Sequence, residues 1–136
     1  MDTFALFLPF QSLQKIARGN GIVNHLIASR ALGARAFHTG ISELPVGVPA
    51  PRHKHNAEEQ VTVLEGSVQI TLDDRTQICS RFDSTLIAAG VEHTLVNIGN
   101  TTAFVLVVYG SPDVTRTFAA TGETVAIGSA ADHFTA

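Results

Sequence analysis

The sequence predicts one all-β domain. Between residues 21 and 110, short runs rich in β-branched residues alternate with turn residues. Turn signals recurring about every eight to twelve residues are typical of a β-sandwich or a β-barrel. The chain has 136 residues, of which 45% are hydrophobic and 15% are charged, so it is long enough and apolar enough to bury a core of its own.

We expect nine strands, and their ranges follow in chain order: 22–29, 34–43, 51–55, 58–65, 67–72, 75–81, 84–87, 93–98 and 103–109. Asp73 and Asp74 separate two of these runs and predict a tight hairpin. Long helical periodicity is absent, and only residues 11–18 could form a short helix. We expect residues 1–20 to pack on this barrel or on that of a neighbouring subunit. The tail, residues 111–136, could lie over the barrel or remain free.

The predicted strand at 103–109 is apolar on both faces. Such a strand cannot have one face in water, so either the N-terminal segment or a second subunit must cover it. The sequence therefore favours a homodimer over a monomer.

Charge and composition exclude several classes of function. The net charge is −3, the pI is about 6.0, and basic residues form no cluster, so we expect no nucleic-acid partner. The apolar run at residues 4–10 is too short to span a bilayer and is broken by Pro9, so we expect a cytoplasmic protein without a membrane partner. The single Cys79 cannot form an intrachain disulfide, and we expect it to be a small buried or edge residue.

Two histidines, His53 and His55, are separated by one residue and follow Pro49 and Pro51. The prolines disfavour a helix, and on a strand residues i and i+2 lie on the same face. Both imidazoles could then bind one metal ion while Lys54 points away. A His-x-His pair alone is weak evidence, because such pairs are often structural or exposed.

A carboxylate and a third imidazole strengthen the metal hypothesis. In the next predicted strand Glu59 shares a face with Val61 and Val63, so Glu59 should point inward and Glu58 outward. A buried carboxylate is costly unless it meets a cation or strong hydrogen-bond donors. His93 begins a later strand that could lie beside residues 53–55. Three imidazoles and one carboxylate suit one divalent ion of iron, manganese, nickel, copper or zinc.

Together these residues resemble the two motifs of the cupins, a superfamily of small β-barrels. The positions that match the first motif are Gly47, His53, His55, Glu59 and Gly66, and those that match the second are Gly90, His93 and Asn97. The resemblance implies a small single-domain cupin of the conserved-barrel type, a double-stranded β-helix or jelly-roll barrel. The domain would span residues 1–136, with a motif core at 47–97 and a metal held by His53, His55, Glu59 and His93.

Two positions depart from the second motif. Phe82 stands where the motif has its first glycine, and Ala88 stands where it has proline. Both are turn positions, so we expect altered loop geometry and an intact metal site.

The function stays open between two classes. One is a mononuclear metal-dependent enzyme, an oxygenase, isomerase or lyase acting on a small and partly apolar substrate. The other is a non-catalytic cupin that binds or senses a sugar or another small molecule around a structural metal. The residues expected to contact the small molecule are Val61, Val63, Leu95 and Tyr109.

The sequence gives weaker support for a function of the other polar residues outside the motifs. Tyr109 and Arg116 could reach the rim of the pocket, but packing and surface charge are the favoured explanations for them. His25, His38 and His133 are expected to be exposed.

Overall fold

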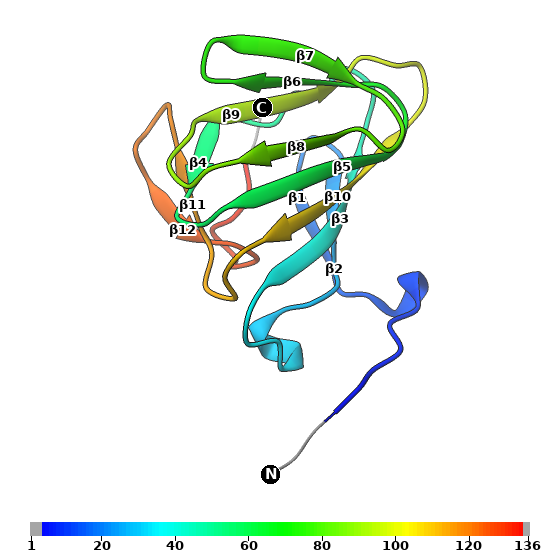
Figure 1. Cartoon of the computed structure of the whole chain (residues 1–136), viewed down its shortest axis with the longest axis vertical. Coiled ribbons are helices and arrows are strands. Elements are labelled where there is room, and N and C mark those ends of the chain that lie inside the picture. The colour runs from blue at the N-terminus through cyan, green and yellow to red at the C-terminus, as the bar shows by residue number, and fades with distance from the viewer. Residues whose placement is uncertain (1–3, 135–136) are drawn as a thin grey trace.

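A computed structural model describes residues 4–134, so residues 1–3 of the N-terminal segment and 135–136 of the tail lie outside the described part. Two antiparallel sheets of six strands each pack face to face (Figure 1). In spatial order the first sheet contains β1 (Lys15–Gly19), β2 (Ile22–Leu26), β3 (His38–Leu44), β10 (Ala103–Tyr109), β5 (Glu59–Glu65) and β8 (Ser84–Ile87). The second contains β12 (Thr124–Ala126), β11 (Thr115–Phe118), β4 (His53–His55), β9 (His93–Asn97), β6 (Val68–Leu72) and β7 (Arg75–Cys79). This is a jelly-roll barrel, and the predicted fold class is confirmed.

The core lies between the sheets and follows the alternation of the strands. Val61 and Val63 of β5 are buried, as are Val105 and Val107 of β10, whereas Gln60 is exposed. Each fully buried valine contributes roughly 1.5–3 kcal/mol relative to an exposed one. The same alternation carries Glu59 to the inside of the barrel and leaves Glu58 exposed, which is the parity that the sequence predicts.

The hairpin predicted at Asp73 and Asp74 is present. Strands β6 and β7 pair antiparallel with Leu72 opposite Arg75, so the two aspartates form the turn. Asp73 has φ 51°, in the left-handed region that aspartate tolerates better than most residues.

The short helix considered possible at residues 11–18 does not form. A short 3-10 helix, η1 (Phe10–Ser12), is followed by β1, which pairs with β2 and places Lys15 opposite His25. Pairing with a neighbouring strand satisfies the backbone of this segment and overrides its weak helical preference. Asn20 and Gly21, both with positive φ, form the turn between β1 and β2, and this Asn-Gly pair is a hairpin signal that the sequence analysis missed.

Two predicted strands differ most from their predicted bounds. The strand predicted at 22–29 ends at Leu26, and the strand predicted at 34–43 begins only at His38. A second 3-10 helix, η2 (Arg30–Leu32), lies between them and ends at Gly33, whose φ of 103° is readily available only to glycine.

The C-terminal tail is part of the barrel rather than a free extension. Strand β11 pairs with β4, and β12 pairs with β11, so the tail extends the second sheet beyond the two histidines of β4. Farther along, the backbone N–H of Phe134 donates to the carbonyl of Arg18 at 2.7 Å. The tail thereby connects the second sheet to β1 of the first.

Phe82, which stands where the second motif has its first glycine, has a left-handed backbone conformation. It adopts φ 74°, the conformation that a glycine at this motif position would favour, and its N–H donates to the carbonyl of Val63 at 2.6 Å. A side chain in this left-handed region costs roughly 1–2 kcal/mol in backbone strain.

The two faces of β10 differ in burial. Val105 and Val107 face the core, whereas Phe104, Leu106 and Val108 on the outer face are half-buried. The N-terminal segment leaves the barrel near β2 (Figure 1), where Phe10 packs on His25 with ring centroids 4.5 Å apart. No helix within residues 4–134 is long and apolar enough to cross a membrane.

Candidate metal centre

Strand β4 presents two histidines to the inside of the barrel. His53 and His55 are buried on either side of the exposed Lys54, as expected for an extended segment. His93, the first residue of β9, lies directly opposite His53 in the antiparallel ladder. Two adjacent strands of one sheet therefore supply all three imidazoles.

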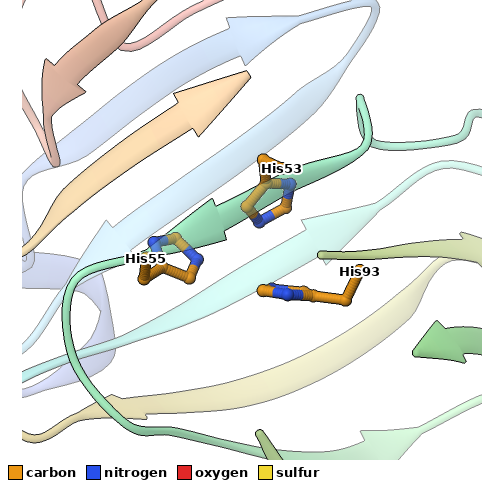
Figure 2. Close-up of side chains that lie close together, drawn as sticks. All are labelled: His53, His55 and His93. Atoms are coloured by element: carbon orange, nitrogen blue, oxygen red, sulfur yellow. The ribbon is translucent and has the colours of Figure 1, made fainter. Parts of the chain in front are cut away.

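The three rings converge on one point (Figure 2). The potential ligand nitrogens of the three rings all lie within 4.8 Å of one another. In the part of the chain that the structure describes, this is the only group of three or more histidine, cysteine, aspartate or glutamate residues placed so that they could share one metal ion. The centroids of His53 and His93 are 4.4 Å apart, and those of His55 and His93 are 5.2 Å apart.

Hydrogen bonds to the backbone fix the tautomer of each ring. The Nδ1 atoms of His53, His55 and His93 lie 2.6, 2.9 and 2.8 Å from the carbonyl oxygens of Pro51, Thr115 and Val91, respectively. A carbonyl oxygen can only accept, so each Nδ1 must carry the proton. In a neutral imidazole Nε2 then has a free lone pair, which is the arrangement typical of histidines that bind metals.

Glu59 approaches these lone pairs from the opposite sheet. Its Oε1 atom lies 2.8 Å from Nε2 of His93 and 3.3 Å from Nε2 of His55. All three atoms are buried, and none has a hydrogen bond of acceptable geometry within residues 4–134. An ionised carboxylate and two such nitrogens are all acceptors, so a shared cation would satisfy them together.

The environment keeps these groups in the state that binds metals. Burial raises the pKa of Glu59, and hydrogen bonds donated by His55 and His93 would lower it. Because Nε2 of both rings is unprotonated in the tautomer described above, a bound cation would take the place of these donors and keep the carboxylate ionised. Burial, followed by the positive charge of Arg116, lowers the pKa of His53 well below its ordinary value, so this imidazole is neutral. The residues therefore fit a divalent transition metal in charge, tautomer and ligand type.

Two further residues flank the imidazoles. Tyr109 is buried, lies opposite Glu59 in the ladder between β10 and β5, and packs edge-on against His55 at 4.8 Å. Burial, followed by the negative charge of Glu59, raises its pKa and keeps the phenol protonated. Arg116 lies opposite His55 between β11 and β4 and is 3% exposed. Sequence reasoning gave Arg116 no role, because the strand that carries it was not predicted.

Two of the three histidines predicted to be exposed are buried. His133 is exposed, but His38 lies inside the barrel 5.8 Å from the ring of Tyr109, and burial lowers its pKa. His25 is buried under Phe10 on the outer face of β2, with Nε2 3.2 Å from Glu43. The predictions failed because neither the parity of these strands nor the segment covering them was recognised.

The four residues expected to contact the small molecule lie in different surroundings. Val61 and Val63 belong to the packed core, and Leu95 packs against that core from a half-buried position. Tyr109 lines a cavity of about 20 Å³, which has room for about one water molecule.

A larger cavity opens between β7 and β8, at the edges of the two sheets, and has a volume of about 510 Å³. Its wall combines apolar and polar side chains, among them Ile70, Leu72, Arg75, Gln77, Cys79 and Thr85. Leu72 of β6, one of the residues in this wall, is the cross-strand neighbour of His93. Cys79 is buried there, as expected.

Comparison with known proteins identifies the family. The family model described as "Cupin domain" matches residues 40–109, slightly more than half of the chain. The chain belongs to the cupin family. No curated protein matches this cupin.

Solved structures show the same fold. The polyketide cyclase RemF from Streptomyces resistomycificus is 21% identical, with a TM-score of 0.73, and the match covers 95% of this chain and 89% of RemF. KdgF from Halomonas sp. is 14% identical, with a TM-score of 0.67 and coverages of 79% and 94%. A cupin 2 domain-containing protein from Halorhodospira halophila is 25% identical, with a TM-score of 0.64. That match covers 69% of this chain and 66% of the other, slightly less than two thirds of its length.

Proposed function

We propose that this cupin binds one divalent transition metal ion through four side chains, namely His53, His55, Glu59 and His93. The observation that carries the proposal is the approach of Oε1 of Glu59 to the Nε2 atoms of His55 and His93, all of them buried and without a suitable donor between them. Leaving such groups unsatisfied would cost about 1–3 kcal/mol each, and more for the charged one. A shared cation removes this cost.

We propose further that the metal serves an enzymatic reaction of the oxygenase, isomerase or lyase type on a small, partly apolar organic molecule. A bound ion of this kind would supply Lewis acidity at a carbonyl, a hydroxyl or dioxygen. The residues of the chain hold the imidazoles in one tautomer and exclude water. Tyr109 can hold a proton close to Glu59, since its phenol remains protonated. The cavity between β7 and β8 has a size suited to such a molecule.

A second candidate is a binding or sensing cupin in which the metal is only structural. One observation favours it: all four proposed ligands are at most 6% exposed, so the centre is enclosed. A closed centre with no exchangeable position would stabilise the barrel without supporting a reaction.

Metal analysis followed by activity assays separates the two candidates. The purified protein should contain, or take up, about one equivalent of Fe²⁺, Mn²⁺, Ni²⁺, Cu²⁺ or Zn²⁺. The metal-loaded protein is then tested in an oxygen electrode and by product analysis with 1,2- and 1,3-diketones, catechols and thiols. Similarity to the fold of a polyketide cyclase makes ketones reasonable members of that panel. Failure to bind any of these ions would overturn the metal proposal, and metal binding without turnover would favour the structural candidate.

We also propose that the protein forms a homodimer through its N-terminal segment. Apolar side chains are exposed along this segment, and Phe7 is 99% exposed. The segment extends away from the barrel (Figure 1), while the outer face of β10 carries the half-buried Phe104, Leu106 and Val108. A second copy of the chain would bury both surfaces at once.

A further inference from the structure

A cluster of three buried charged side chains lies inside the barrel next to the candidate metal centre. Arg18 of β1, Arg116 of β11 and Asp132 of the C-terminal tail are 5%, 3% and 0% exposed. The guanidinium of Arg116 donates through one terminal N–H to Oδ1 of Asp132. Arg18 contacts the same oxygen at 3.4 Å and donates through Nε to the backbone carbonyl of Asp132 at 2.9 Å. One carboxylate thus neutralises only one of two arginines.

Arg116 is the member of this cluster that adjoins the metal centre. It lies directly opposite His55 in the ladder between β11 and β4, and both side chains are buried on the inner face of the sheet. Side chains that face each other across antiparallel strands have Cβ atoms about 4.5–5.5 Å apart. Nε of Arg116 is buried and has no acceptor within residues 4–134. A buried N–H donor with a positive charge is therefore available on the residue paired with His55.

The balance of charge inside the barrel changes when a metal binds. The charged side chains buried within residues 4–134 are two arginines, Arg18 and Arg116, and two carboxylates, Glu59 and Asp132, so they cancel. The imidazoles of the centre are counted as neutral, because each of them donates through Nδ1 to a carbonyl and keeps a free lone pair on Nε2. A divalent ion would leave a net charge of plus two in a medium of low dielectric constant, which is unfavourable unless an anion accompanies it.

We infer that the molecule bound at this centre is a small organic oxyanion, a carboxylate or an enolate, and that Arg116 is a binding residue for it. The inference rests on the proposed function, because the oxyanion balances the charge of the proposed metal. A guanidinium is the side chain best suited to oxyanions, since its N–H donors match their geometry and its charge is permanent. Arg116 therefore selects charged over neutral ligands of the same shape.

The test uses the whole chain loaded with Co²⁺, whose visible spectrum reports changes at the metal. Metal content and the affinity for Co²⁺ are measured first. Pyruvate and methyl pyruvate, which differ mainly in charge, are then titrated into the apo and Co²⁺ forms by calorimetry and by absorption. We expect pyruvate to bind the Co²⁺ form at least tenfold more tightly than methyl pyruvate does. Equal affinities would overturn the inference, and this comparison needs no variant.

Two variants then test the residue itself. Arg116→Gln removes the positive charge and should weaken pyruvate binding about tenfold or more, which is the loss expected when a charged hydrogen bond is removed. Arg116→Lys keeps the charge and should retain part of the affinity for pyruvate. Arg35→Gln, which removes an arginine outside this cluster, is the matched control and should bind pyruvate like the wild type. Circular dichroism and Co²⁺ content establish that each variant is folded and loaded.

The outcomes separate the two proposals. A wild-type protein that takes up neither Co²⁺ nor any of the five ions named above overturns the proposed function and the inference with it. Normal Co²⁺ binding with unchanged pyruvate affinity in Arg116→Gln overturns the inference alone. If Arg116→Gln does not fold, the wild-type comparison and the Arg116→Lys variant decide. The inference is supported if the wild type prefers pyruvate over methyl pyruvate and Arg116→Lys keeps only part of that preference. It is overturned if the wild type shows no preference.

Discussion

Nε2 of His93 lies 2.8 Å from Oε1 of Glu59, although the two residues come from different sheets and are only 2% and 4% exposed. The Nδ1 proton of His93 is used by the carbonyl of Val91, so Nε2 of the neutral ring meets the carboxylate as a second acceptor. This contact is unfavourable in the metal-free protein and becomes favourable when a cation binds. Two of the predictions that follow test this reading directly.

Removing an imidazole should abolish tight metal binding. We expect His55→Ala and His93→Ala to lower metal affinity by well over tenfold, because loss of a direct ligand should exceed the roughly 10–100-fold effect of losing a supporting residue. Equilibrium dialysis with Zn²⁺ or Co²⁺ measures the change. Glu58→Ala is the control and should bind like the wild type, since Glu58 is exposed. Equal losses for Glu58→Ala and Glu59→Ala would show that Glu59 is not a ligand.

Glu59→Gln should have opposite effects on the two forms of the protein. The amide of glutamine can donate to Nε2 of His93, so the metal-free variant should be as stable as the wild type or more stable by about 1 kcal/mol. Metal affinity should fall, because a neutral amide replaces the charged ligand. Urea unfolding in the presence of a chelator measures the first effect, with Glu58→Gln as the control. A metal-free variant destabilised by several kcal/mol would mean that His93 is a protonated partner of Glu59.

The metal-free protein should lose stability on acidification through His53. Burial and Arg116 lower the pKa of His53 well below its ordinary value of about 6.5, so below that pH the unfolded chain takes up a proton that the folded protein does not. The free energy of unfolding should therefore fall by up to about 1.4 kcal/mol per pH unit from this residue, until the pH reaches its folded pKa. Unfolding in urea between about pH 7.5 and 5.5, on either side of the ordinary pKa, measures the slope. This slope should be smaller in His53→Asn than in the wild type. It should stay unchanged in His133→Ala, because His133 is exposed. Identical slopes in all three proteins would show that His53 is not the residue responsible.

Asp132 should be essential for the stability of the barrel. It pairs with Arg18 and Arg116 and accepts the N–H of Gly128 at 3.0 Å, so Asp132→Asn leaves two buried arginines without a counter-charge. Breaking a buried ion pair by removing one partner typically costs about 3–5 kcal/mol. Asp74→Asn at the exposed hairpin turn should cost little, because surface substitutions usually change stability by less than about 0.5 kcal/mol. The urea concentration at the midpoint of unfolding is measured for each variant. Equal midpoints for Asp132→Asn and Asp74→Asn would show that the charged cluster does not stabilise the barrel.

Self-association should depend on the N-terminal segment. Light scattering coupled to gel filtration should give the mass of a dimer for the wild type and of a monomer for Phe7→Ser, because Phe7 is the most exposed aromatic residue within residues 4–134. Ile78→Ser, which removes an exposed apolar side chain of β7, should remain dimeric. A wild type that is monomeric at high concentration would rule out the homodimer.

The local alternation of apolar and polar residues was sufficient to predict most strands of the barrel and the inward direction of the proposed ligands on β4 and β5. A strand places every second residue on one face whatever its neighbours are, so the parity of His53, His55 and Glu59 could be determined without knowing which strands pair. The same reasoning failed at β1, where the preference of the segment was weak and its pairing with β2 decided the outcome. It also missed β11, whose four residues carry little pattern of their own.

The sequence by itself determined an all-β domain and a set of residues suited to a metal, because periodicity and spacing are properties of short segments, and its two motifs supplied the resemblance to cupins. Only the tertiary structure decided that Glu59 meets His93 across the two sheets and that Arg116 lies opposite His55 while sharing Asp132 with Arg18. Arg18 and Asp132 are separated by 114 positions in the chain. Contacts between residues so far apart in the sequence depend on the order of strands within the sheets and on the path of the tail. Both are set by the packing of the whole chain.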